Sequence, residues 1–175
     1  MEPGLVIILV IAALFIFKQN KSKDSNGLLT DDAVTVKEVV NLLDEFVPVF
    51  NDKLKTGFTE ADIQKQLHRF LKTKIVHVNR EHGIEDVNAL KIDFDLGHGK
   101  VGIEVKLASQ LFKQPNLHRM VGQLQDYTNN KYDKKNLIVF VVGTDEDFTE
   151  RVYLSKIEEK VKEAKATYVS KSIKK

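Results

Sequence analysis

Residues 91–106, with the sequence KIDFDLGHGKVGIEVK, constrain the fold more than any other part of the chain. They predict two strands joined by a tight turn, because glycine adopts the positive φ angles that hairpin loops need. Side chains alternate between the two faces of a strand. In the first strand this alternation separates an apolar set from a charged set: Ile92, Phe94 and Leu96 on one face, and Lys91, Asp93 and Asp95 on the other.

The second strand of the hairpin follows the same rule. Its apolar residues Val101, Ile103 and Val105 are predicted to share one face, with acid and lysine on the opposite one. The hairpin is therefore expected to gather three charged side chains on one sheet face: Asp93, Glu104 and Lys106. Two carboxylates beside an ammonium are typical of a metal site. The alternative is a salt-bridge cluster across the hairpin.

The acid-x-Lys triplet is not distinctive in a chain in which 30% of the residues are charged. It recurs at residues 133–135, 158–160 and 163–165, in a polar loop or on a charged helix, where solvated charge is the natural explanation. Only residues 104–106 lie in an apolar strand opposite an acidic strand. The context of this triplet therefore indicates a site, and the triplet alone does not.

Two helices are predicted before the hairpin from the helical spacing of apolar residues. Residues 30–32, TDD, can cap the first, and Pro48 should end or kink it. The second opens with Thr59 as its N-cap and Glu60 in its first turn. Residues 75–78 are then expected to form a short strand.

The remaining elements are less regular. Residues 79–86 are expected to form a polar loop, and residues 116–130 a helix. Residues 136–143, NLIVFVVG, read as a strand that is covered on both faces, usually a parallel one. A last helix is predicted from the apolar positions Phe148, Val152, Ile157 and Val161. The tail is expected to add a short edge strand or to fray.

Strands that bracket a helix, with further helices on both sides, predict an α/β fold with a mixed central sheet flanked by helices. A length of 175 residues suits one domain of ordinary size. The chain has no cysteine, which excludes disulfides, zinc-thiolate sites and thiol catalysis. The formal charge of +2 does not by itself indicate nucleic-acid binding.

The N-terminus carries an uncharged apolar run at residues 4–17. The run is shorter than the roughly 20 residues that usually span a bilayer, but flanking lysines can snorkel to close the mismatch. We expect a transmembrane anchor at residues 1–18, a linker at 19–27 and the folded domain at 28–175. Lysines follow the run directly, so the positive-inside rule puts the domain on the cytoplasmic side of the membrane. The alternative is a buried helix of the domain.

Two motifs resemble one enzyme family. Asp93, ten intervening residues and then Glu104-Val105-Lys106 resemble the PD-(D/E)xK nuclease superfamily. Gln123 and Tyr127 on the following helix resemble the Q-xxx-Y motif of its RecB-type branch. The resemblance covers about residues 59–143 and implies a restriction-endonuclease-like core. Two departures concern the aspartate: Ile92 stands where the motif has proline, and Asp95 competes with Asp93 for the role.

The resemblance implies metal-dependent phosphodiester hydrolysis with Mg²⁺ or Mn²⁺ as cofactor. Asp93 and Glu104 would hold the metal, with the carbonyl oxygen of Val105 as a third ligand. Lys106 would orient or help to deprotonate the attacking water and stabilise charge on phosphate. The other three implied catalytic residues would hold a metal-bound water or second ion, position the lysine, or contact the nucleotide: Glu60, Gln123 and Tyr127.

The implied substrate is nucleic acid, with DNA favoured over RNA. Four basic residues are candidates for phosphate contacts by position and charge: Lys100, Lys113, Arg119 and Lys131. Ordinary surface charges are the alternative interpretation for each. Many enzymes of this family act as homodimers, and the sequence leaves the oligomeric state open.

Two other functions fit the same sequence. One is an inactive module of nuclease fold that binds nucleic acid or a protein partner at the membrane. The other is a membrane-anchored scaffold whose acids bind only structural cations. Metal-dependent cleavage would separate an enzyme from both, and salt-dependent binding of nucleic acid without cleavage would favour the first.

Overall fold

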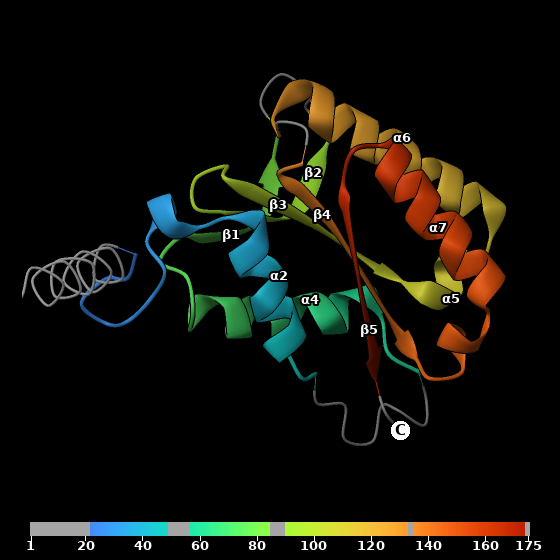
Figure 1. Cartoon of the computed structure of the whole chain (residues 1–175), viewed down its shortest axis with the longest axis horizontal. Coiled ribbons are helices and arrows are strands. Elements are labelled where there is room, and N and C mark those ends of the chain that lie inside the picture. The colour runs from blue at the N-terminus through green and yellow to red at the C-terminus, as the bar shows by residue number, and fades with distance from the viewer. Residues whose placement is uncertain (1–21, 49–56, 85–89, 133–134, 174–175) are drawn as a thin grey trace, which may run out of the picture.

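The computed structural model of the chain describes residues 22–48, 57–84, 90–132 and 135–173. A five-stranded mixed sheet forms the centre, with the strands in the order β1-β2-β3-β4-β5 (Figure 1). The first three strands are antiparallel neighbours, whereas β4 and β5 add in parallel. Their bounds are Val78–Gly83, Lys91–Leu96, Val101–Leu107, Leu137–Thr144 and Thr167–Ile173.

Helices cover both faces of this sheet. On one face, α2 (Val36–Glu45) and α4 (Glu60–Lys72) pack on apolar side chains of β2, β3 and β4. On the other face lie α6 (Gln114–Asn130) and α7 (Arg151–Glu163), with the short α5 (Ala108–Leu111) leading into α6 (Figure 1). Short 3₁₀ turns, η1 (Asp31–Ala33) and η2 (Asp147–Thr149), complete the described elements. The predicted α/β class, with a mixed sheet between helices, is confirmed.

Side-chain caps fix where the two helices before the hairpin begin. Thr59 accepts a hydrogen bond from the Asp62 amide, and Asp62 accepts one from the Thr59 amide, which completes a capping box at α4. The predicted cap of this helix is therefore confirmed. For α2 the cap is Thr35, whose Oγ1 accepts from the amide of Glu38 at 3.2 Å. The predicted cap at residues 30–32 instead opens η1, and α2 ends before Pro48.

The two C-terminal strands follow from their composition. Every residue of β4 but Thr144 is buried, since β4 lies between β3 and β5 and is covered on both faces. The tail forms the parallel edge strand β5, paired with β4 from Thr167 to Ile173. Both elements agree with the expectation of a buried parallel strand and an edge strand.

Local predictions are also wrong at the edge strand, where only Val78 of the strand expected at residues 75–78 lies in β1, at Ile92 and on α7. Residues 79–83 form most of strand β1 instead of a loop, because β1 is an edge strand whose residues are partly buried or exposed and are therefore mostly polar. Ile92 packs against the α6 side of the sheet, whereas Phe94 and Leu96 pack against the opposite side. Val152 is 82% exposed, so it contributes nothing to the core face of α7.

The N-terminal part of the described chain is tied to the domain. Asp24 accepts hydrogen bonds from the amides of Asn26 and Leu28, and the amide of Leu29 donates to the carbonyl of Lys74. Residues 22–27 of the predicted linker thus form a hydrogen-bonded turn next to the domain. The predicted anchor at residues 1–18 lies outside the described residues. Among the described helices, none is long and apolar enough to cross a membrane.

Gly102 tests the packing between the hairpin and α6. A Cβ at this position would lie 2.5 Å from Ile92 Cδ1 and 2.8 Å from Tyr132 Cζ, and both side chains are fully buried. Gly102→Ala should therefore lower the free energy of unfolding by about 1–3 kcal/mol. Gly122→Ala is the matched control, since nothing lies within 4 Å of its Cβ in the middle of α6.

Chemical denaturation measures both variants. The control should be more stable than the parent by roughly 0.5–1 kcal/mol, because alanine favours helix over glycine. Equal stabilities for the two variants would contradict the described packing.

Candidate metal centre

Asp93 occupies the place where the hairpin strands separate. The pairing of β2 with β3 runs from Leu96 and Val101 to Phe94 and Ile103. Beyond that pair, the Val105 amide donates to the carboxylate of Asp93 at 2.7 Å instead of to a β2 carbonyl. In the β1–β2 register Glu81 falls opposite Asp93, between the pairs Arg80–Phe94 and His82–Ile92. Glu81 has a positive φ of 52°, which is unusual in a strand. This local distortion accounts for the change of face at Ile92.

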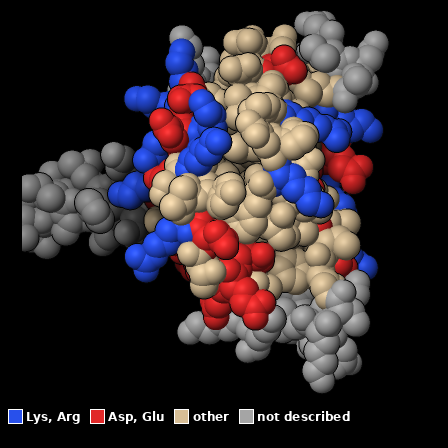
Figure 2. All heavy atoms as spheres, turned by 90° about the vertical axis from the view of Figure 1, so that its right-hand side faces the viewer, with Lys and Arg blue, Asp and Glu red and all other residues tan. Residues whose placement is uncertain are grey.

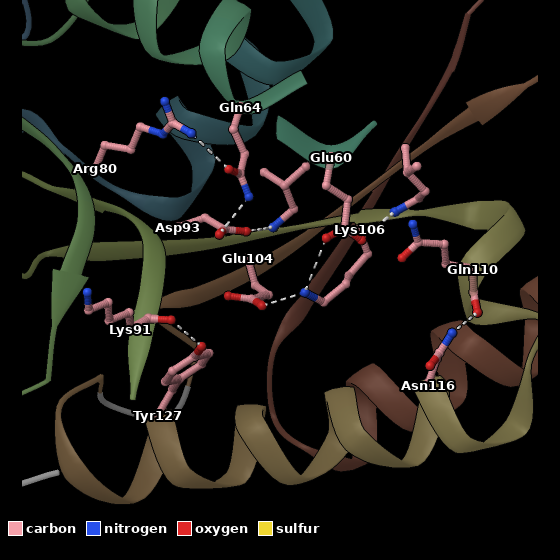
Figure 3. Close-up of polar contacts among 12 residues, drawn as sticks. Glu60, Gln64, Arg80, Lys91, Asp93, Glu104, Lys106, Gln110, Asn116 and Tyr127 are labelled. Atoms are coloured by element: carbon pink, nitrogen blue, oxygen red, sulfur yellow. Dashed lines mark hydrogen bonds and ion pairs between the residues drawn. The ribbon is translucent and has the colours of Figure 1, made fainter. Parts of the chain in front are cut away.

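A side chain from α4 holds the other oxygen of Asp93. Gln64 Nε2 donates to Asp93 Oδ1 at 2.8 Å, and Gln64 Oε1 accepts from Arg80 Nη2 at 3.2 Å (Figure 3). Both Asp93 oxygens therefore have donors, and the carboxylate is fixed in orientation. Gln64 and Arg80 were not predicted as site residues. The one signal was the i, i+4 spacing of Glu60 and Gln64.

Glu104 is the most unusual side chain of the site. It is only 3% exposed, and its Oε1 accepts from Lys106 Nζ at 2.6 Å. Its Oε2 is buried and has no hydrogen-bond partner of good geometry among the described residues; the Tyr127 hydroxyl lies beside this carboxylate but donates to the Lys91 carbonyl. Burying a carboxylate oxygen without a partner is costly, so a native site of this kind points to an additional ligand.

The pKa shifts of Asp93, Glu104 and Lys106 indicate that negative charge exceeds positive charge in the site. Burial, reinforced by the neighbouring Glu104, raises the pKa of Asp93 to about 7. Burial also raises the pKa of Glu104, although the charge of Lys106 acts against the shift. For Lys106, burial opposes the ammonium form, but the charges of Glu104 and Glu60 outweigh it and raise its pKa. One lysine thus faces several carboxylates in a poorly solvated space.

Glu60 reaches the same space from the first turn of α4. Its Oε1 accepts from the Leu107 amide at 3.2 Å, and its Oε2 lies 4.0 Å from Lys106 Nζ (Figure 3). The capping box at Thr59 fixes this turn, so the position of Glu60 follows from the local sequence. The structure thus brings Glu60, one of the implied catalytic residues, to within 4.0 Å of the hairpin lysine.

Helix α6 closes the site from the opposite side. Gln123 lines a cleft of about 160 Å³ together with Glu60, Lys106 and Arg119; the cleft also contains Gln110, Leu111 and Asn116. Tyr127 is buried, and its hydroxyl donates to the Lys91 carbonyl at 2.7 Å. Burial and the adjacent Glu104 raise the pKa of this phenol, so it stays protonated. The structure thus brings both residues of the helix motif to the hairpin.

Asp95, the competing aspartate, belongs to a different cluster. It is 2% exposed, accepts from the hydroxyl of Tyr132 at 2.6 Å and pairs with Lys131 Nζ at 3.1 Å. Asp93, in contrast, lies close enough to Glu104 for the charge of Glu104 to raise its pKa. The geometry therefore selects Asp93 as the partner of Glu104.

The four basic candidates for phosphate contacts are not gathered together. Arg119 lines the cleft that holds Lys106, whereas Lys131 is paired with Asp95. Lys100 lies 3.9 Å from Asp32 and is 54% exposed, and Lys113 is the exposed residue before α6. Figure 2 shows lysines and arginines in separate groups, with acidic side chains among them, on the face that it draws. Arg119 is the candidate that lines the same cleft as Glu60 and Lys106.

Comparison of the chain with protein-family models, with curated proteins and with solved structures finds no match. What the site does must therefore be argued from its own geometry.

The raised pKa of Asp93 predicts how cation binding depends on pH. A divalent cation binds the deprotonated carboxylates, so it must displace the proton that Asp93 holds below about pH 7. Affinity for Mn²⁺ should rise with pH up to that value and then level off. Below it, the slope should approach about tenfold per pH unit for one displaced proton.

Isothermal titration with Mn²⁺ at several pH values measures this dependence. Asp93→Asn is expected to weaken binding and to flatten its pH dependence. An affinity of the parent chain that does not change across pH 7 would contradict the account.

Proposed function

We propose that the chain is a metal-dependent nuclease that hydrolyses phosphodiester bonds, with DNA favoured as substrate and Mg²⁺ or Mn²⁺ as cofactor. The observation that carries the proposal is the buried Oε2 of Glu104, which accepts no well-formed hydrogen bond from the described residues, beside Asp93 and Lys106. The order of elements around it supports the likeness to the PD-(D/E)xK superfamily: a helix with Glu60, the acidic hairpin, a helix and a buried strand.

The donor set fits the cofactor. Asp93 and Glu104 offer hard carboxylate oxygens, and the proposal adds the backbone carbonyl oxygen of Val105 from the same strand. Oxygen donors of this kind suit Mg²⁺ and Mn²⁺, and the donor set described around Glu104 contains no imidazole or thiol to favour a softer metal. A bound divalent cation would supply charge stabilisation at the phosphate and lower the pKa of a coordinated water.

The other side chains of the site have separate roles in the proposed reaction. The pKa of Lys106 is raised, so its side chain is an ammonium that donates to a water or phosphate oxygen and stabilises negative charge. Glu60, held by the Leu107 amide, keeps this ammonium within the cleft. Arg119 lines the cleft and supplies a second cation for phosphate. Gln64 and Arg80 orient Asp93 through their hydrogen bonds.

The close pair of Lys106 with Glu104 also supports a second candidate, an inactive module of nuclease fold that binds nucleic acid or a protein partner. At 2.6 Å the ammonium already neutralises one carboxylate oxygen without any metal. In such a module the cluster would be structural. Cleavage, as distinct from binding, separates the two functions.

The test uses the full-length chain, purified in a mild detergent, with single- and double-stranded DNA and with RNA. Cleavage should need Mg²⁺ or Mn²⁺ and stop in EDTA. Lys106→Ala and Glu104→Gln should each slow cleavage roughly 100-fold or more, because each removes a charge that acts on the reacting phosphate or its cation. Lys156→Ala, on exposed α7 surface, is the matched control and should cleave like the parent.

Cleavage that survives both substitutions would refute the assigned site. Salt-dependent DNA binding by the parent without cleavage in either metal would favour the inactive module.

We further propose that the domain is tethered to the cytoplasmic face of the membrane through residues 1–18. The uncharged run at residues 4–17 and the lysines that follow it support this tether. Removing residues 1–18 should shift the chain from the membrane pellet to the soluble fraction after cell fractionation. An unchanged distribution would refute the tether and would leave the proposed activity unaffected.

A further inference from the structure

A second group of metal-ligating side chains lies at the turn end of the hairpin. His77 precedes β1, His98 lies in the turn between β2 and β3, and Asp31 opens η1. His77 Nδ1 is 2.9 Å from Asp31 Oδ2, and His98 Nε2 is 3.6 Å from the same oxygen. The two imidazole rings have centroids 4.1 Å apart. One ligand atom from each of the three residues lies within 4.8 Å of the others.

We propose that Asp31, His77 and His98 form a binding site for a divalent transition metal, with Zn²⁺ as the best-fitting ion. Two imidazole nitrogens and one carboxylate oxygen are donors that Zn²⁺ and its neighbours in the first transition series prefer. Mg²⁺ favours oxygen donors and a nearly ideal octahedron, so this group discriminates against it. The site is thus distinct in chemistry from the oxygen-only group around Glu104.

The backbone holds the three ligands in place. The amide of Gly97 donates to the carbonyl of His77 at 3.0 Å, which ties the hairpin turn to the start of β1. A Cβ on Gly97 would lie 3.0 Å from Val34 Cβ and 3.4 Å from the Asp31 carbonyl oxygen, so the η1 segment is packed directly against the turn. Three segments that are distant in sequence therefore present their ligands without any rearrangement of the main chain.

His98 adds a further indication. It has a φ of 53°, a left-handed conformation that is unfavourable for a residue with a Cβ and that glycine adopts readily. The flanking residues Gly97 and Gly99 also have positive φ. A histidine at the central position directs an imidazole towards Asp31, which a glycine would not do.

The exposure of the group suits an exchangeable ion. The side chains of His77 and His98 are 46% and 63% exposed, and that of Asp31 is 29% exposed. Three protein ligands leave at least one coordination position for water, as in zinc sites that are not closed by a fourth side chain. A bound ion would join η1 to the hairpin turn and so fasten the N-terminal segment of the described chain to the central sheet.

The test is a Zn²⁺ titration of the full-length chain without a histidine tag. All proteins carry Glu104→Gln, which removes the buried carboxylate of the other site. The parent of this series should bind one equivalent of Zn²⁺. His77→Ala and His98→Ala should each weaken the affinity by more than about tenfold, the loss that follows even from removing an outer partner of a metal ligand. His118→Ala, an exposed histidine on α6, should bind like the parent.

Two readouts separate a metal site from a structural contact. Zn²⁺ should raise the melting temperature of the parent and not that of a variant lacking both histidines, while all variants melt alike in EDTA. Co²⁺ in place of Zn²⁺ should give visible d–d absorption that is lost in the same double variant. Equal Zn²⁺ affinity in the parent and the double variant, or no saturable binding by the parent, would overturn the proposal.

Discussion

The site depends on a burial of negative charge that the protein itself does not fully neutralise. Glu104 is almost completely buried, one of its oxygens has no partner among the described residues, and Asp93 lies near it at the point where the strands separate. Among the described residues, the cation close to them is Lys106, which Glu60 also approaches. Such a group is destabilising for the fold alone, because removing charges from water costs several kcal/mol per ion. A ligand with positive charge would relieve that cost.

The strands and helices around Glu104 hold the charged side chains of the site in fixed positions. The buried β4 supports β3 along its whole length, so Glu104 and Lys106 stand on a rigid strand. The capping box at Thr59 fixes the first turn of α4 and with it Glu60. Helix α6 packs against the sheet. Its Gln123 lines the cleft with Glu60 and Lys106, and its Tyr127 donates a hydrogen bond to the Lys91 carbonyl. The elements α4, β3, α5 and α6 thus meet at one cleft, which is the kind of support that a preorganised functional site needs.

The sequence was sufficient where local periodicity decides the structure. Alternation in residues 101–106 predicted the common face of Glu104 and Lys106, and the uninterrupted apolar run predicted the buried strand β4. It failed where long-range contacts decide. Residues 79–83 look like a loop until their pairing with β2 makes them a strand. The change of face at Ile92 follows from a backbone distortion that no side-chain pattern encodes.

Sequence patterns also could not identify residues that come into contact from distant segments of the chain. Gln64 holds Asp93 from helix α4 and is itself held by Arg80 of the edge strand; beyond the i, i+4 spacing of Glu60 and Gln64, the sequence does not mark them. The same applies to Asp31, His77 and His98, which are ordinary polar residues in sequence and neighbours only in the fold. The choice between Asp93 and Asp95 needed the structure as well, because both fit the alternation.

The most direct test of the central claim is to locate a cation. A crystal of the protein soaked in Mn²⁺ and measured at the manganese absorption edge would show bound manganese by its anomalous scattering. The account predicts a peak in contact with Glu104 Oε2 and a carboxylate oxygen of Asp93, with Lys106 displaced from its 2.6 Å contact with Glu104. A fully soaked crystal without a peak there, and with the Lys106–Glu104 pair intact, would contradict it and leave the cluster as a buried salt bridge.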